Sequence, residues 1–379
     1  MTVPYRSDVA QIAAIATYGE APVVETVPLP SPEAGAIVVK MDVATVCGTD
    51  VHQWQGAYAA AFGLQPPICM GHEGVGVILE RGKGVETDSA STPLTEGDRV
   101  IWTHQACGQC HECSVLGAEV LCTNRTMGMH QSIHTFPHVS ATFGTHSYVW
   151  PRAGRLRVPD GVKSEWASAA SCALRTVKSA LEKIPTLGTH DTVVIQGAGP
   201  LGLFATAAVS VHRPRKLIVV GAPDSSLELA RQWGATDTIS IGDLPDAESR
   251  KAAIQGLTDG RGPNVTLEFA GVPSAFAEAL DFTARGGHVV LVGSAANAPH
   301  PTSAHHIVTK QLSVSGCYSA TIGHYAQALD FIDRFQGEFD WDQMLGNRYR
   351  LDQLGDALSR MRSGTEAKPI IVPEVGPSY

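Results

Sequence analysis

One stretch decides the fold of the second half of the chain: Val193-Val194-Ile195-Gln196-Gly197-Ala198-Gly199-Pro200-Leu201-Gly202. An apolar run leads into three glycines spaced as G-x-G-x-x-G, and a helix-compatible run follows them. Glycines at this spacing let the backbone turn sharply from a strand into a helix, and they let a pyrophosphate approach the N-terminus of that helix. The motif therefore predicts a dinucleotide site that uses Gly197, Gly199, Pro200, Leu201 and Gly202. The alternative is a turn that only packs a helix on a sheet.

The chain beyond this motif alternates short apolar runs with helical patterns. Apolar runs at 217–220, 265–267 and 289–292 are separated by helix-like segments at 226–233 and 275–283. This rhythm predicts a parallel sheet that is covered on both faces.

The first half of the chain has a different pattern. Residues 35–50 and 74–103 contain short β-branched runs punctuated by Gly, Pro and Asp, which predicts an irregular, mostly β domain. Beyond residue 320, two helical stretches precede an extended Pro369-Ile370-Ile371-Val372.

The uncharged stretch 192–211 reaches transmembrane length, but Gln196, glycines and Pro200 interrupt it. We therefore expect a buried strand, a turn and a helix and no membrane insertion.

Composition excludes several classes of protein. The 379 residues are enough for about two or three domains, and 44% hydrophobic residues describe a globular chain. The net charge of −9, without a basic block, argues against a nucleic-acid partner. The first eleven residues lack a long apolar core, so we expect no secretory signal and a reduced, cytoplasmic location for the eight cysteines.

Four of these cysteines share one short loop. Cys107, Cys110 and Cys113 are separated by two residues each, and Cys122 follows after eight more. Four thiolates at this spacing predict a closed, tetrahedral structural zinc site. An iron–sulfur cluster is disfavoured because no proline follows Cys122 and no second run of cysteines exists. Four unrelated buried thiols are the remaining alternative.

A third set of candidate residues is dispersed: Cys47 to His52, then Gly71-His72-Glu73, then Cys172. Each of these residues alone has an ordinary explanation, because single cysteines are often small buried apolar groups. Their spacing by itself does not favour a metal site.

Taken together, these motifs resemble the zinc-dependent medium-chain alcohol dehydrogenases over essentially the whole chain. The matching landmarks are, in chain order, Cys47-Gly48-Thr49-Asp50, Gly71-His72-Glu73-Gly74, the four-cysteine loop, Cys172-Ala173-Leu174-Arg175-Thr176, Gly197 to Gly202, and Lys368-Pro369-Ile370-Ile371. The resemblance implies an α/β protein with two domains. A GroES-like β domain at 1–172 would be completed by 320–379, and a Rossmann domain with a doubly wound parallel sheet would occupy 173–319.

The resemblance also implies a catalytic zinc site. Cys47, His72 and Cys172 match the three protein ligands, Glu73 matches a transient ligand, and Asp50 matches the carboxylate that orients the ligating histidine. Two thiolates and one imidazole leave the fourth position open for water or an alcohol oxygen. There the alcohol loses its proton, and a hydride passes from its carbon to the nicotinamide.

Further roles follow from the same resemblance. Thr49 and His52 match a relay that carries the alcohol proton to solvent, and the alternative for His52 is a surface histidine that packs near the ribose. Trp54 and Trp102 match walls of the substrate pocket, with ordinary core packing as the alternative. The positions implied for the cofactor, beyond the glycine motif, are Thr176, Val292, Gly293, Ser294 and Cys317 near the nicotinamide, and Lys368 near the pyrophosphate.

The chain departs from the family pattern in three places. Eight residues separate Cys113 from Cys122, where seven is commonest. The segment from Cys122 to Tyr148 is long and contains four histidines, which either reshape the mouth of the pocket or lie in an ordinary loop. Gly221 ends the second strand of the coenzyme domain, where NAD-selective members usually have an acidic residue.

These observations together predict an oxidoreductase that interconverts a primary or secondary alcohol with its aldehyde or ketone. We expect two zinc ions per chain, NAD(H) in preference to NADP(H), a small-molecule substrate, and a homodimer or homotetramer. Residues 222–226 offer no cation for the phosphate of NADP, although an NADP-dependent carbonyl reductase stays an alternative. A zinc-free quinone or enoyl reductase would lack the Cys47, His72 and Cys172 set. A non-enzymatic dinucleotide-binding protein is the other rival.

Overall fold

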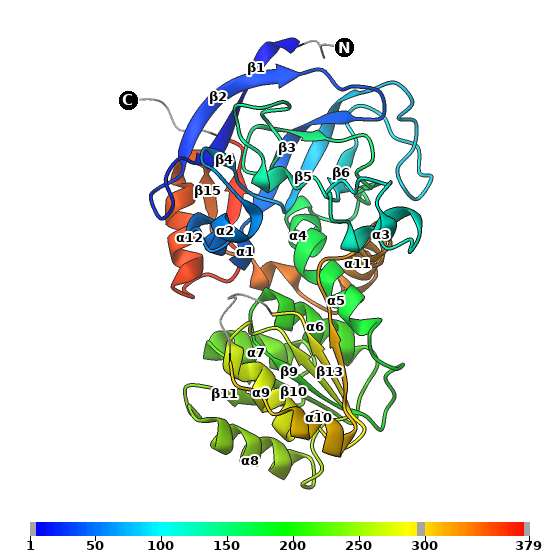
Figure 1. The fold of residues 1–379 in the computed structure, drawn as a ribbon, viewed down its shortest axis with the longest axis vertical. Coiled ribbons are helices and arrows are strands. Elements are labelled where there is room, and N and C mark those ends of the chain that lie inside the picture. Colours follow the sequence, from blue (N-terminus) through cyan, green and yellow to red (C-terminus); the bar gives the residue numbers. More distant parts are fainter. Residues whose placement is uncertain (1–4, 294–299, 375–379) are drawn as a thin grey trace. The chain divides into compact units, whose positions relative to one another are not determined.

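The protein is described here by a computed structural model that covers residues 5–293 and 300–374. The chain forms two compact units (Figure 1). The first comprises residues 1–172 and 320–379, and the second comprises residues 173–319.

The second unit contains a six-stranded sheet in the order β11-β10-β9-β12-β13-β14, with every neighbouring pair parallel. The strands are β9 (Thr192–Gln196), β10 (Lys216–Gly221), β11 (Asp237–Ser240), β12 (Val265–Glu268), β13 (His288–Leu291) and β14 (Ser313–Gly316). The interior positions of β9, β10 and β13 are buried Val, Ile and Leu, which suits strands that are covered on both faces. The strand order reverses between β9 and β12, so this is the doubly wound α/β arrangement that the alternating pattern predicts.

Six helices cover this sheet in two groups. The helices are α5 (Arg175–Leu181), α6 (Pro200–Ser210), α7 (Asp224–Gln232), α8 (Ala247–Leu257), α9 (Pro273–Phe282) and α10 (Ala304–Lys310). Helix α6 packs against α5 and α7, whereas α9 packs against α8 and α10. The uncharged stretch 192–211 is divided between the buried strand β9 and helix α6, as expected. Within the described part of the chain, no helix combines the length and the apolar character that crossing a bilayer requires.

The first unit is built on two sheets. A seven-stranded sheet has the order β15-β16-β3-β5-β6-β8, with β7 also paired to β3, and a three-stranded sheet has the order β2-β1-β4. The strands are β1 (Tyr5–Ile15), β2 (Val23–Pro30), β3 (Ile37–Thr45), β4 (Ile68–Cys69), β5 (Gly74–Arg81), β6 (Arg99–Trp102), β7 (His146–Val149), β8 (Arg155–Arg157), β15 (Arg348–Arg350) and β16 (Ile370–Val372). Two buried apolar clusters line these sheets.

The helical elements of the first unit are mostly short. They are α1 (Gly48–Trp54), α2 (Ala59–Phe62), α3 (His111–Ser114), α4 (Ser164–Ala169), α11 (Ile322–Phe335) and α12 (Leu354–Arg362), the 3-10 turns η1 (Glu119–Leu121), η2 (Gly128–His130), η4 (Trp341–Met344) and η5 (Leu351–Gln353), and one π-helical turn, η3 (Ala170–Leu174).

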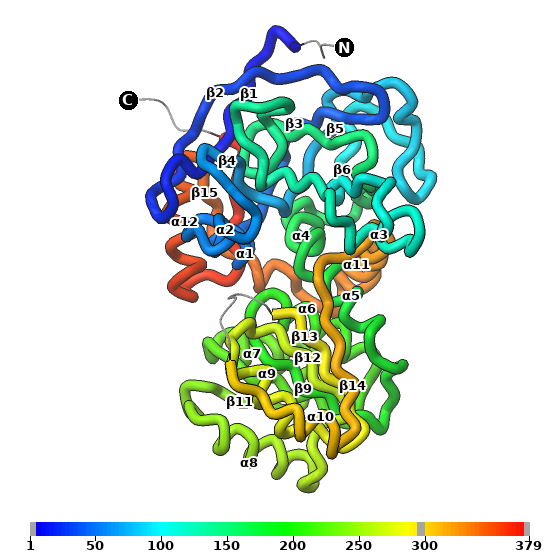
Figure 2. Tube along the Cα trace, in the orientation of Figure 1, coloured from blue at the N-terminus to red at the C-terminus, as the bar shows by residue number. Residues whose placement is uncertain are grey.

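The C-terminal segment returns to the first unit as a strand of its main sheet. β16 pairs antiparallel with β3, joining Ile370 to Thr45 and Ile371 to Ala44, and the Val46 N–H donates to the Pro369 carbonyl at 3.0 Å. Figure 2 shows this red C-terminal segment beside the blue N-terminal strands. The pairing brings Lys368 next to the loop that begins at Val46, far from it in sequence.

The glycine motif allows a direct test of the turn after β9. A Cβ atom at position 202 would lie 1.8 Å from the Gly197 carbonyl oxygen, whereas a Cβ at position 199 would meet no atom within 4 Å. We therefore expect Gly202→Ala to lower the free energy of unfolding by about 1–3 kcal/mol or more, through overpacking. The control Gly199→Ala should cost no more than about 1 kcal/mol, the difference between Gly and Ala at an N-cap. Urea unfolding measures both values, and equal losses would contradict the geometry of this turn.

Candidate functional site

Three residues distant in sequence converge in the first unit. Cys47 is the N-cap residue of α1, His72 lies between β4 and β5, and Cys172 lies in the π-helical turn η3. Their ligand atoms and a carboxylate oxygen of Glu73 all lie within 4.8 Å of one another. The dispersed set of the sequence therefore forms one cluster.

Local backbone features place two of these side chains. Gly71 has φ = +90°, and a Cβ there would lie 2.6 Å from Thr142 Oγ1, so only glycine fits immediately before His72. Cys172 occupies a π-helical turn, a helical irregularity that is common at functional sites.

Asp50 orients the imidazole of His72. Asp50 Oδ1 lies 3.1 Å from His72 Nδ1, and Asp50 Oδ2 accepts a hydrogen bond of 2.8 Å from the backbone N–H of Cys47. The carboxylate is fully buried. Its bond to Nδ1 directs His72 Nε2 toward Cys172, whose Sγ lies 3.4 Å away. The orienting role expected of Asp50 matches this geometry.

The electrostatics of the cluster call for a cation. Hydrogen bonding with Cys172 and burial raise the pKa of Cys47 to about 12, so two thiolates are unfavourable here without compensation. Burial opposes a charge on His72, but Asp50 and Cys172 raise its pKa well above the usual range. Two sulfurs and one imidazole nitrogen are the donor set of an open catalytic zinc site, and the residues present fit that ion.

Glu73 belongs to a buried polar network behind the cluster. Glu73 Oε2 lies 2.5 Å from Lys368 Nζ and accepts a 2.6 Å hydrogen bond from Thr45 Oγ1, which in turn lies 2.8 Å from Ser168 Oγ. Glu73 Oε1 has no hydrogen-bond partner among the described residues. Burial raises the pKa of Glu73 to about 7, although Lys368 lowers it. One carboxylate oxygen is therefore anchored, and the other is left available beside the metal-binding atoms.

Lys368, which the family resemblance implies near the pyrophosphate, takes part in this buried network. Its side chain is 1% exposed and paired with Glu73, so its charge compensates that carboxylate, and its role at the pyrophosphate stays a prediction. Burial opposes the charge on Lys368, but Glu73, Cys47 and Cys172 raise its pKa. The register of β16 places Lys368 beside the end of β3, and this position brings it to Glu73. Thr45 and Ser168 complete this network, and nothing in the sequence pattern singles them out.

The packing of Trp54 matches the alternative given for it, ordinary core packing, and a place in the pocket wall stays a prediction. Trp54 is 6% exposed, belongs to the core cluster beneath α1, donates its indole N–H to the Glu20 carbonyl, and lies under the guanidinium of Arg362 at the end of α12. Trp54 is therefore a core residue, because the packing of α1 against α12 turns it inward. Trp102, at the end of β6, is only partly buried, and its place as a pocket wall stays a prediction.

The histidine-rich segment braces the strand before His72. The Cys69 N–H donates to the Gln131 carbonyl, and the Phe143 N–H donates to the Met70 carbonyl. His130 packs on Phe62 with ring centroids 4.8 Å apart, and burial, followed by the charge of His72, lowers its pKa to about 4. The other histidines of the segment are His134, His138 and His146. The segment thus packs against the residues that lead to His72, and whether it also shapes the mouth of the pocket stays a prediction.

Helix α1 places the expected relay residues next to the cluster. Thr49 and His52 lie on α1 on either side of Asp50, and both side chains are half-buried. The ring of His52 meets that of Tyr58 edge-on, with centroids 6.2 Å apart. A proton relay through them stays a prediction.

The four-cysteine loop gathers its sulfurs as expected. The Sγ atoms of Cys107, Cys110, Cys113 and Cys122 lie within 4.8 Å of one another, with Cys110 Sγ at 3.4 Å from Cys113 Sγ and 3.9 Å from Cys122 Sγ. Zn–S bonds of about 2.3 Å place tetrahedral sulfurs about 3.8 Å apart, so these separations fit zinc. Backbone N–H groups of Gln109 and Cys110 lower the pKa of Cys107 to about 6, which favours its thiolate. The eighth spacer residue is therefore compatible with a four-sulfur site.

In the second unit, the glycine motif forms the turn between β9 and α6. Gly197 has φ = +103°, and a Cβ there would lie 2.9 Å from the Ala270 backbone nitrogen. Gly199 is open, and Pro200 occupies the first turn of α6. The turn lies at the carboxyl ends of β9 and β12, where strand order reverses and ligands of such sheets bind.

The positions expected near the nicotinamide lie at the same edge or on α5. The N–H groups of Val292 and Gly293 both donate to the Glu268 carbonyl, and the Cys317 thiol donates to the Thr176 carbonyl at 3.9 Å. Ser294 lies outside the described residues. The buried Glu268, whose Oε1 accepts from the Gly271 N–H at 2.7 Å, supports this edge and was not anticipated; burial raises its pKa.

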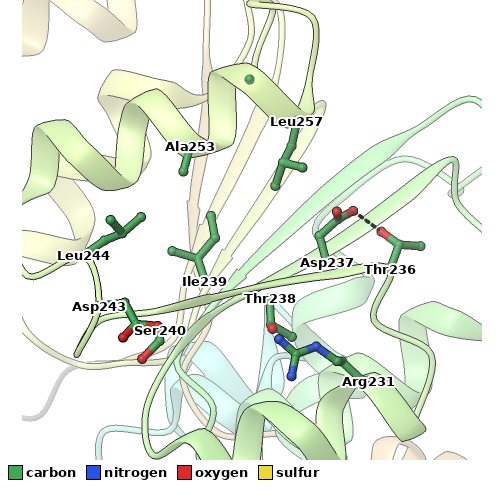
Figure 3. Close-up of a pocket in the computed structure, with 11 residues that line it drawn as sticks. Arg231, Thr236, Asp237, Thr238, Ile239, Ser240, Asp243, Leu244, Ala253 and Leu257 are labelled. Carbon is green, nitrogen blue, oxygen red and sulfur yellow. Dashed lines mark hydrogen bonds between the residues drawn. The ribbon is translucent and has the colours of Figure 1, made fainter.

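Close packing leaves no room for a side chain at position 221. A Cβ at this position would lie 2.7 Å from the Ala198 backbone nitrogen, inside the glycine turn. Asp224 lies three residues on, and its Oδ1 accepts a 2.8 Å hydrogen bond from Ser240 Oγ. Two nearby cations are engaged elsewhere, since Arg231 pairs with Glu228 at 3.2 Å and Lys216 pairs with Asp237 at 3.1 Å. Figure 3 shows Arg231 and Asp237 at a pocket beside β11.

The Glu73–Lys368 pair predicts a non-additive pair of substitutions. Lys368→Met leaves a carboxylate buried without a cation, so we expect the free energy of unfolding to fall by about 3–5 kcal/mol. Adding Glu73→Gln to Lys368→Met removes the uncompensated charge and should recover most of that loss. Urea unfolding at neutral pH measures both variants. A double variant no more stable than Lys368→Met would contradict the pairing.

Comparisons with known proteins agree with this geometry. Residues 33–159 match the alcohol dehydrogenase GroES-like domain, and residues 200–334 match the zinc-binding dehydrogenase domain. The chain is 33% identical to 5-exo-hydroxycamphor dehydrogenase of Pseudomonas putida, over 91% of this chain and 94% of that protein. It is 28% identical to L-threonine 3-dehydrogenase of Chromobacterium violaceum, over 94% of this chain and 98% of that one. A solved alcohol dehydrogenase of Thermotoga maritima superimposes with a TM-score of 0.89 at 28% identity, over 97% of this chain and all of the other. The chain therefore belongs to the zinc-binding medium-chain dehydrogenases, oxidoreductases that act on CH–OH groups.

Proposed function

We propose that the protein is an NAD(H)-dependent alcohol dehydrogenase with one catalytic and one structural zinc ion. The observation that carries this proposal is the cluster of two sulfurs and one imidazole, completed by an orienting carboxylate. Cys47, His72 and Cys172 would hold the catalytic ion, and the four-cysteine loop would hold the structural one. When bound, the catalytic zinc ion supplies Lewis acidity for the alcohol oxygen, and NAD supplies the nicotinamide that accepts the hydride.

The residues around the cluster divide the remaining work. Asp50 keeps the Nδ1 proton on His72, so that Nε2 stays free as a ligand atom. The Thr49 hydroxyl accepts the proton of the alcohol, and the imidazole of His52 passes it to solvent, because an imidazole can both accept and donate a proton. Glu73 Oε1 is a spare acceptor beside the ligand atoms, held in place by Lys368 and Thr45.

We propose a secondary alcohol as the substrate. The names of both curated relatives describe the oxidation of a secondary hydroxyl group, in hydroxycamphor and at carbon 3 of threonine. Phe62 is 50% exposed and packs at a tilt against His130, and such an exposed ring beside the cluster would suit an apolar alicyclic alcohol better than a zwitterionic amino acid. The eight free cysteines, six of which are proposed zinc ligands, support a reducing, cytoplasmic location. Assembly as a homodimer or homotetramer stays a prediction from the family resemblance.

Metal content separates the two sites. We expect about two zinc ions per chain, and Cys172→Ala should reduce this to about one and abolish most turnover while the protein stays folded. Cys110→Ser should instead lower stability, because a closed four-sulfur site holds its loop together. Cys69→Ala, a buried thiol outside both clusters, is the control and should retain both ions. Metal analysis and turnover assays on purified variants measure this, and full activity in Cys172→Ala would refute the proposed mechanism.

Cofactor choice follows from the end of β10. Among the described residues near this strand end, Lys216 and Arg231 are each paired with a carboxylate and do not offer a cation to the 2′-phosphate of NADP. The carboxylate of Asp224 would repel that phosphate. We therefore expect kcat/KM to favour NAD over NADP, by less than in enzymes with an acidic residue at the position of Gly221. The assay uses cyclic secondary alcohols, simple primary alcohols and L-threonine with each cofactor. A preference for NADP above about tenfold, or 1.4 kcal/mol, would show that a cation reaches this site.

A further inference from the structure

The second unit, which carries the glycine turn and is called the coenzyme-binding unit below, has a cavity at the end of its sheet where the strands begin. Its volume is about 640 Å³, and its lining comes from the segments that precede β9, β10 and β12 and from the C-terminal parts of α8, α9 and α10. The glycine turn follows the opposite, carboxyl end of β9. The strand of five residues between them spans about 16 Å, so the cavity is separate from the dinucleotide site.

The lining of this cavity is strongly cationic. Two carboxylates, Asp259 and Asp281, face six cationic side chains, in a protein whose net charge is −9. The six are Arg215, Lys216, Lys251, Arg261, Arg285 and Lys310. The pocket of equal volume along β11 (Figure 3) is lined by one cation, Arg231, and two carboxylates. The excess of positive charge is therefore found in the cavity at the start of the strands and not in the pocket along β11.

The ion pairs of the cavity do not use up this charge. Arg215 and Arg261 share one carboxylate, Asp259, at 3.1 and 3.2 Å, and Lys251 pairs with Asp281 at 2.8 Å. Lys216 pairs with Asp237, which lies outside the lining.

The two remaining cations bind only backbone oxygens among the described residues. Arg285 donates to the Thr309 carbonyl at 2.7 Å, and Lys310 donates to carbonyls at the end of α9. Together with the shared Asp259, this leaves about three positive charges without a carboxylate of their own.

Capping of helix ends does not account for this surplus. Three helices end at the cavity, and each C-terminus contributes about −0.5 charge at most, or roughly −1.5 in total. A positive potential therefore remains. Burial lowers the pKa of Lys310, Asp281 raises it, and Lys251 and Arg285 lower it.

We propose that this cavity binds a small polyanion that carries two or more phosphate groups. Guanidinium groups pair with phosphate oxygens in a bidentate manner, and lysine ammonium groups add compact charges. A volume of 640 Å³ exceeds the needs of a single phosphate and suits a ligand of nucleotide size. The site does not depend on the catalytic cluster or on the identity of the alcohol.

Isothermal titration of the full chain with inorganic triphosphate tests this site. We expect saturable binding with a Kd of about 1 mM or tighter at low salt, and saturating NADH should not displace the triphosphate. The variant Lys251→Gln/Arg285→Gln should bind at least about tenfold more weakly. Arg231→Gln is the matched control, because it removes one cation of the same unit that does not line the cavity, and it should bind as the unmodified protein does.

Three outcomes would overturn the proposal: no saturable binding, equal affinity in the double variant, or complete displacement by NADH. Should the double variant unfold, Arg285→Gln and Arg215→Gln are tested singly, and unchanged affinity in both would equally refute the site. Added triphosphate should also raise the thermal unfolding midpoint of the unmodified protein but not that of the double variant.

Discussion

Two thiol sulfurs, an imidazole and a buried carboxylate lie within 4.8 Å of one another, and the first unit is organised around the charge that they share. If both sulfurs, Glu73 and Asp50 are ionised, this small volume holds about four negative charges. Burial makes such an arrangement unfavourable without cations, as the raised pKa of Cys47 shows. Lys368 supplies one positive charge, and the proposed zinc ion would supply two more. The chain must therefore bring a lysine from its C-terminal segment to a carboxylate near residue 70, and the pairing of β16 with β3 accomplishes this.

Close packing of the backbone constrains the glycine turn of the coenzyme-binding unit. Gly197, Gly202 and Gly221 each lack a side chain because a Cβ would collide with neighbouring backbone atoms. At position 221 this constraint removes the acidic residue by which many NAD-selective relatives recognise the ribose. In our proposal, recognition of the ribose is left to groups beyond the turn, such as Asp224, which Ser240 holds in place. Close packing of the turn would then limit how strongly the site discriminates between the two cofactors.

Local motifs were predictable from the sequence because their chemistry depends on spacing alone. The four-cysteine loop and the glycine turn place their atoms within a few residues, so the sequence pattern carries most of their geometry. Cys47, His72 and Cys172 gave no such signal, and only the family resemblance brought them together. The alternating pattern likewise predicted the parallel sheet, since buried strands need apolar residues on both faces.

Less could be predicted for residues whose direction depends on tertiary packing. No sequence pattern shows that the register of one C-terminal strand buries Lys368 against Glu73. Nor does one show that the contact of α1 with α12 turns Trp54 into the core. The bracing role of the segment around His130 depends on backbone hydrogen bonds to residues 69–71, which a single sequence does not reveal.

X-ray absorption spectroscopy at the zinc edge, on the protein as purified, tests the central claim most directly. One site with four sulfurs and one with two sulfurs, one nitrogen and one oxygen average to about three sulfurs per zinc, with about half a nitrogen and half an oxygen. That average, at about two zinc ions per chain, is the result that this account predicts. A single zinc ion with four sulfur ligands, or a spectrum without a nitrogen contribution, would show that Cys47, His72 and Cys172 do not form a zinc site.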